Sequence, residues 1–139
     1  MLSAISKAEL ETIFRNIFNG GVMDRLPKSR RNADAFLALA AASLDSQKVF
    51  TEAELNTRLA EWMASFTNPG HLDHVTVRRY LVDLSMLLRD PEGKSYRTNQ
   101  AVISRQIASD TRAVQPEEIL DQVQAARLLR RRQQTNQVS

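Results

Sequence analysis

The stretch from Asp73 to Arg97 (DHVTVRRYLVDLSMLLRDPEGKSYR) constrains this chain most, because a helical apolar pattern runs directly into a hairpin pattern. Four apolar residues recur at 4-3-4 spacing and so share one stripe of a helix: Val77, Leu81, Leu84 and Leu88. The apolar pair at 87–88, the turn DPEG and a return segment ending in Tyr-Arg predict two short strands. A helix with arginines near its start, followed by a basic two-stranded ribbon, is the layout of a winged helix-turn-helix recognition unit.

The segments before this stretch supply the other elements of that layout. We expect a helix over 31–44, a brief strand at 48–50, and a helix over 52–64 that begins at a capping box of Thr51 and Glu54. Asn-Pro-Gly at 68–70 then breaks the chain before the next helix. Trp62 lies on an apolar helical stripe, which favours a core position over a base-stacking one. The predicted fold class is mainly α: a winged helix-turn-helix core of three helices and a small β-hairpin, with N- and C-terminal helical extensions.

The chain divides into four parts. Residues 1–21 form an N-terminal helix whose apolar stripe must be buried, either by docking on the main domain or by pairing with a copy of itself. Residues 22–98 form the winged-helix domain, and 99–132 form two C-terminal helices that begin near Asn99 and Pro116. The polar residues 133–139 are expected to be a disordered tail.

Composition excludes several classes of protein. The chain has no cysteine, so disulfides, cysteine-ligated zinc, iron–sulfur clusters and a thiol nucleophile are excluded, in keeping with a reducing cytoplasm. No secretory signal and no run of about 18 apolar residues is present, so we expect a cytoplasmic protein with no membrane partner. Of 19 cationic residues 15 are arginine, which fits recognition of phosphates and guanine edges. A GC-rich genome would produce the same bias, so charge alone does not decide the function.

Catalytic and metal-binding patterns are absent from the sequence. There is no P-loop, no GxGxxG, no GxSxG and no pair of carboxylates with a predictable shared site, so we expect neither an enzyme nor a cofactor. His71 and His74 straddle the expected helix start at Asp73 without a third ligand nearby, so no metal site is expected. His74 instead lies where the helix dipole would favour a phosphate contact.

The candidate DNA-binding residues fall into three groups. Arg79 lies nearly opposite the buried stripe, Thr76 borders the same outer face and Arg78 lies at the side, so these three would read bases or phosphates in a major groove. Two further groups would contact the phosphate backbone: Lys94 and Arg97 from the hairpin, and Lys28, Arg30 and Arg31 from the basic connector 22–31. Structural alternatives exist for each group: an Arg79–Asp83 ion pair, a carboxylate elsewhere for Arg78, and a solvated hinge for the connector.

A second apolar stripe limits the surface that DNA could reach. Val75, Val82 and Met86 lie on the outer side of the helix, so its C-terminal half should be covered by the terminal helices or by a second subunit. Only the stretch from Asp73 to Arg79 would remain free to enter a groove.

Several spaced motifs resemble those of the prokaryotic domain of unknown function 2087 family, over about residues 26–97. They are LPKSRR before the first domain helix, FTEAELNTRL at 50–59, D-x-x-T-V-R-R-x-L-V-D at 73–83, L-x-R-D at 87–90 and G-x-x-Y at 93–96. The resemblance implies a winged-helix-like domain, found alone or attached to transcriptional regulators, with suspected nucleic-acid binding and no established activity. The chain departs from it at Leu84-Ser85-Met86, where a glycine or similar loop residue is expected before the strand.

These observations predict a winged-helix protein that binds double-stranded DNA and regulates transcription, as a homodimer formed through its terminal helices. A protein–protein interaction module built on the same scaffold is one alternative. A basic protein that associates with RNA or the ribosome is another.

Overall fold

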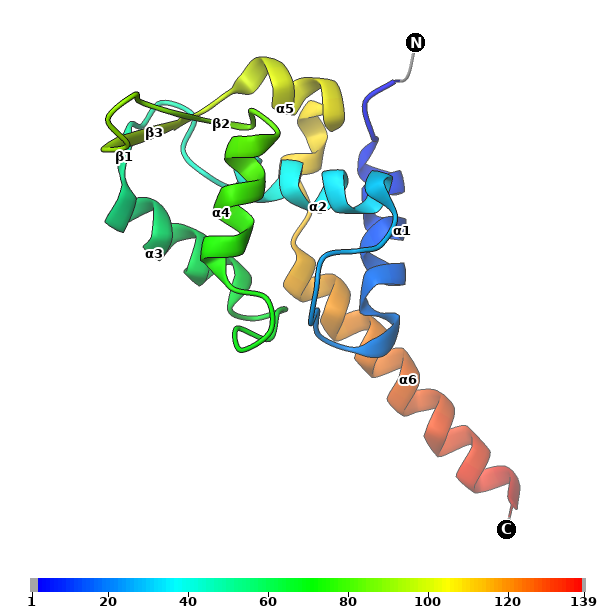
Figure 1. The fold of residues 1–139 in the computed structure, drawn as a ribbon. Coiled ribbons are helices and arrows are strands. Elements are labelled where there is room, and N and C mark those ends of the chain that lie inside the picture. The colour runs from blue at the N-terminus through cyan, green and yellow to red at the C-terminus, as the bar shows by residue number, and fades with distance from the viewer. Residues whose placement is uncertain (1–2, 139) are drawn as a thin grey trace.

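The elements follow the order that the sequence predicts. The computed structural model describes residues 3–138 (Figure 1). Within them the chain forms α1 (Lys7–Ile17), a 3-10 turn (Phe18–Gly20), α2 (Arg30–Ala42), β1 (Phe50–Thr51), α3 (Glu52–Met63), α4 (His74–Asp83), β2 (Leu87–Arg89), β3 (Ser95–Thr98), α5 (Gln100–Gln106), a second 3-10 turn (Ser109–Ala113) and α6 (Pro116–Val138). The mainly helical fold class with a small antiparallel sheet is therefore confirmed, and the order from α2 to β3 is compatible with a winged helix-turn-helix arrangement.

The sheet has three antiparallel strands in the order β1-β3-β2. Phe50 pairs with Tyr96, and Leu88 pairs with Arg97. The carboxylate of Asp90 holds the turn by accepting hydrogen bonds from the backbone N–H groups of the two residues that follow Gly93, at 2.6 and 3.1 Å. Gly93 has φ 73°, and a Cβ there would meet the Arg89 guanidinium, so this turn requires glycine. The predicted hairpin and its brief third strand are confirmed.

Aromatic side chains join the N-terminal helix to the main domain. Trp62 of α3 packs edge-on against Phe66 with ring centroids 4.9 Å apart, and Phe66 also contacts Phe18 and Phe36. The ring centroids of Phe14 in α1 and Phe36 in α2 lie 6.4 Å apart. The apolar stripe of α1 is thus buried within the same chain, and the predicted core position of Trp62 is confirmed.

Side-chain caps define the starts of α1 and α3, the second as the sequence predicts. Ser6 and Glu9 form a capping box at α1, and Thr51 and Glu54 form one at α3. A hydrogen bond from Lys48, with further bonds from Thr51, lowers the pKa of Glu54 to about 2. These bonds fix where the chain enters each helix.

The end of α4 differs from the sequence expectation. Ser85 adopts a left-handed backbone (φ 61°), and two hydrogen bonds close a Schellman motif, from Ser85 N–H to Val82 O and from Met86 N–H to Leu81 O. Ser85 therefore takes the place of the glycine expected before the strand. The prediction that Met86 extends an outer apolar stripe is wrong, because the helix ends at Asp83 and the turn directs Met86 into the core.

The C-terminal region forms a longer helix than expected. α5 is short and the Asn99 side chain makes no capping hydrogen bond. α6 continues to Val138, whereas the sequence predicted a disordered tail from 133; Ser139 lies outside the described residues. The segment contains neither glycine nor proline, and its glutamines propagate a helix readily. Within the described residues, no helix is both long and apolar enough to cross a lipid bilayer.

Candidate nucleic-acid interface

The outward face of α4 carries four exposed side chains, the last of them Asp83 at its C-terminal end. Thr76, Arg79 and Tyr80 face solvent, whereas Val77 and Leu81 on the opposite stripe are fully buried. In the part of the chain that the structure describes, no carboxylate lies within ion-pair distance of Arg79, so the alternative Arg79–Asp83 pair does not form. This surface offers an arginine, a hydroxyl and a phenol together.

Tyr80 extends the exposed surface of α4 beyond Arg79. The sequence placed the residues from Tyr80 onward in the core or an interface; within this chain the Tyr80 side chain is 45% exposed, so it does not belong to the core. The signal was available in the helical step: Tyr80 follows Arg79 by about 100°, which keeps it beside the outward face. The apolar neighbours Val75 and Val82 are half-buried and lie to the other side.

The N-terminus of α4 is capped and leaves two histidines near it. Asp73 Oδ1 accepts the Thr76 backbone N–H at 2.8 Å, and the bonds to Thr76 hold the pKa of Asp73 below its usual range. His74 is the first residue of the helix and is half-buried, while His71 is exposed in the preceding turn. Among the described residues, no three His, Asp or Glu side chains are placed to hold a metal ion.

Arg78 is held by α3. Its side chain is only 14% exposed, and Nη1 lies 2.6 Å from Asn56 Oδ1 and 3.1 Å from Glu52 Oε1. The sequence offered two roles for this residue, groove reading and pairing with a distant carboxylate, and the pairing is confirmed. Arg78 therefore fixes α4 against α3, and DNA could recruit it only by breaking both contacts.

The hairpin presents two cations and retains a third. Lys94 and Arg97 are exposed, and Lys94 forms an ion pair with the exposed Glu92, at 3.4 Å. Arg89 instead lies over the Tyr96 ring, with its guanidinium carbon 5.9 Å from the ring centroid. Lys94 and Arg97 are thus exposed on the hairpin, while Arg89 stabilises the hairpin itself.

The basic connector is shorter than predicted. Ser29 caps α2 by accepting the Asn32 N–H, so Arg30 and Arg31 belong to the first turn of that helix. Arg31 pairs with Glu9 of α1 at 2.8 Å, and Arg30 approaches Asp34 at 3.8 Å. Their prediction as part of an extended arm is wrong for this reason, and Lys28 is the one residue of the three that lies in the connector.

Backbone hydrogen bonds tie the connector to the turn before α4. Met23 N–H donates to Phe66 O at 2.9 Å, and Asn68 N–H donates to Met23 O at 2.8 Å. The chain around Met23 therefore runs beside the turn that leads into α4, a proximity that no local sequence signal indicates.

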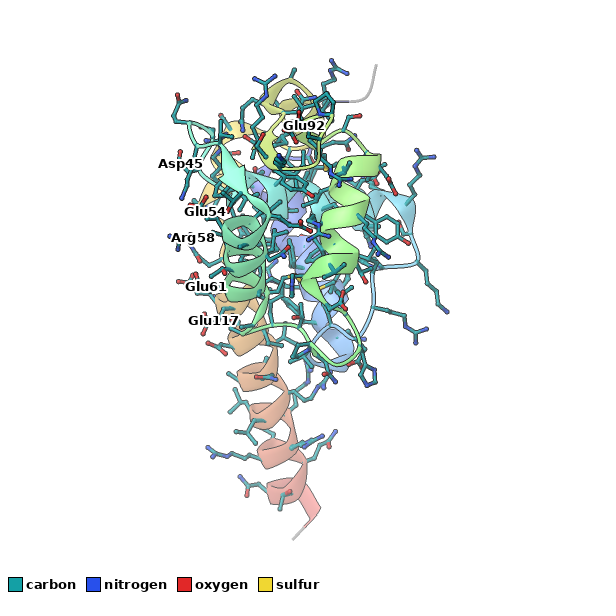
Figure 2. The ribbon with its side chains drawn as sticks, turned by 60° about the vertical axis from the view of Figure 1, so that its left-hand side comes forward. Asp45, Glu54, Arg58, Glu61, Glu92 and Glu117 are labelled. Carbon is teal, nitrogen blue, oxygen red and sulfur yellow. The ribbon has the colours of Figure 1, made fainter. Side chains whose placement is uncertain are left out.

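A different side of the molecule is acidic. Figure 2 shows Glu54 and Glu61 of α3 and Glu117 of α6 along one edge, with α4 on the other side of the view. Arg58 lies between the two α3 glutamates and pairs with Glu61 at 3.3 Å. A polyanion would be repelled from this edge, so the α4 side is the more favourable one for its approach.

Comparison with known proteins identifies the family. The model of a bacterial family described as uncharacterized proteins conserved in bacteria (DUF2087) matches residues 10–98. The chain belongs to this family. The match begins within α1 and ends with β3, so it starts earlier than the expected resemblance and leaves α5 and α6 outside. No curated protein and no solved structure matches the chain.

Proposed function

We propose that this DUF2087 protein binds double-stranded DNA and regulates transcription, with the outward face of α4 entering a groove. The observation that carries the proposal is the exposed group of Thr76, Arg79 and Tyr80, in which Arg79 has no ion-pair partner among the described residues. An arginine that folding leaves unpaired keeps its full set of donors for guanine or phosphate.

The side chains divide by what they would contact. Thr76 and Arg79 would meet base edges, and Tyr80 would pack beside them against the groove wall. His74, Lys94, Arg97, Lys28 and the exposed Arg30 would contact phosphates, which adds affinity without sequence preference. Arg78 would orient α4 from behind. Asp83 lies at the far end of the same face, and its charge would confine the approach of phosphates to the first two turns of the helix.

Fluorescence anisotropy with random duplex at two salt concentrations tests binding directly. We expect binding at low salt that falls steeply as salt is added. Protein binding releases cations from the phosphates, and added salt opposes that release. A duplex selected from a random pool then separates the roles. Arg79→Ala should weaken binding to the selected site by about 1–3 kcal/mol, whereas Lys94→Ala should weaken selected and random duplexes alike.

Arg58→Ala is the matched control, because it removes another exposed arginine, from the acidic edge, and should leave affinity unchanged. Equal losses for Arg79→Ala and Lys94→Ala on both duplexes would overturn the assignment of roles. No binding at low salt would refute DNA binding and favour the protein-interaction module. If an RNA duplex competes more strongly than a DNA duplex, the ligand is RNA and not DNA.

A further inference from the structure

The distal half of α6 projects from the body of the protein (Figure 1). Ile119 and Leu120 are buried and Val123 is half-buried. Further along the helix, the Arg127 guanidinium donates a hydrogen bond to the carbonyl of Asn19. Every described side chain from 128 to 136 is exposed. A 23-residue helix is about 34 Å long. The side chains of residues 128–135 thus extend into solvent beyond the body of the protein.

One face of this helix runs unbroken from the body to the free end. With a step of about 100° per residue, the side opposite Ile119 and Val123 carries Glu118, Asp121, Ala125, Leu128, Leu129 and Arg132. Leu128 and Leu129 are 51% and 56% exposed, which is unusual for two adjacent leucines. This outward face of α6 therefore combines an apolar centre with charged ends.

The charges at its two ends are opposite and separated. The acidic residues are at 117, 118 and 121, and three arginines are at 130–132. No acidic residue stands three or four positions from one of these arginines, so the helix cannot neutralise them within itself. In the described part of the chain, neither group forms an ion pair.

We propose that α6 pairs antiparallel with α6 of a second copy of this chain through this outward face. Halfway between the acidic residues and the arginines lies Ala125, which would meet its own counterpart on a two-fold axis. Turning the partner end for end about that point places Glu118 against Arg132, and the two-fold axis repeats the contact. In the same register Leu128 of each copy would lie against Gln122 of the other and Leu129 against Asp121, on either side of the Ala125 pair.

The other occupants fit this face less well. A parallel pair would set glutamates against glutamates and arginines against arginines. A nucleic acid could use the arginines, but the acidic end would repel it and the leucines would stay wet. Only an antiparallel copy satisfies both ends and the centre. Because α6 lies outside the matched family region and away from α4, the pairing does not depend on DNA binding.

A charge exchange tests the pairing by sedimentation equilibrium. We expect the natural chain to be a dimer in the micromolar range. Glu118→Arg or Arg132→Glu alone should weaken the dimer about ten-fold, because like charges then meet at two places. Combining the two substitutions in one chain should restore it. Arg130→Glu is the matched control: it makes the same charge change two residues away on the opposite side and should have little effect.

Single cysteines give an independent measure, because the chain contains none. Ala125→Cys should form a disulfide-linked dimer on mild oxidation, whereas Arg132→Cys, on the same face near the free end, should not, because it would lie against Glu118 of the other copy. Equal cross-linking at both positions would indicate a parallel pair and overturn the proposal. A monomer at all concentrations, or failure of the double charge exchange to restore association, would also overturn it. A monomer whose arginine variants lose duplex binding would assign the face to phosphates instead.

Discussion

The inward and outward faces of α4 place the same residue types under different constraints. Arg78 and Arg79 are adjacent, yet Arg78 is held by Asn56 and Glu52 while Arg79 extends into solvent. A turn of about 100° between neighbours on a helix produces this difference. Two adjacent arginines in a sequence therefore need not share a role. Here packing against α3 holds Arg78, and Arg79 remains available to a ligand.

The largest difference between the faces should appear on truncating an apolar side chain. Leu81 is fully buried, so Leu81→Ala should lower the free energy of unfolding by about 2–5 kcal/mol by removing contacts and leaving a cavity. Tyr80→Ala, one residue away on the exposed side, should change it by no more than about 0.5 kcal/mol. Urea unfolding followed by circular dichroism measures both. Similar losses would mean that Tyr80 is also packed, and would remove it from the proposed interface.

The two arginines should separate stability from binding. Arg78→Ala should cost about 1.5–3 kcal/mol of unfolding free energy, because it removes charged hydrogen bonds between α3 and α4. The lower end is expected, since Glu52 is half-exposed. Arg79→Ala should leave the urea midpoint nearly unchanged and act on duplex affinity. Arg78→Lys serves as the conservative variant and should recover only part of the stability, because the lysine ammonium is more strongly hydrated than a guanidinium and costs more to bury. A stable Arg78→Ala protein with lost duplex affinity would reverse the two roles.

Local signals in the sequence predicted the parts of the fold that depend on neighbouring residues. The box at Thr51, the helix start at Asp73 and the turn at Asp90 involve partners within five positions, and the structure contains all of them. Apolar periodicity likewise predicted the burial of the α1 stripe and of Trp62, because a helix with such a stripe must bury it.

Contacts between distant residues could not be assigned in the same way. Arg78 and Asn56 are 22 positions apart, as are Arg31 and Glu9, so their pairing depends on how α1, α2, α3 and α4 pack. The sequence indicated that Arg78 could pair with a carboxylate instead of DNA, but it could not indicate which residue supplies that carboxylate. The exposed arginines Arg79 and Arg97 can therefore be distinguished from the paired Arg78 and Arg31 only in the three-dimensional structure.

The smallest expected effect concerns Ser85, in the turn that follows the end of α4. Ser85 has φ 61°, a conformation that costs a non-glycine residue about 1–2 kcal/mol, so Ser85→Gly should relieve that strain. Glycine loses about 0.5–1 kcal/mol of backbone entropy on folding, which leaves a net gain of about 0.5 kcal/mol. Ser104→Gly, the same substitution at an exposed position inside α5, should instead destabilise by about 0.5 kcal/mol. Opposite shifts of the urea midpoint would establish that the chain turns at Ser85. A loss at both positions would mean that the helix continues past Asp83, and would return Met86 to the outer stripe that the sequence pattern suggested.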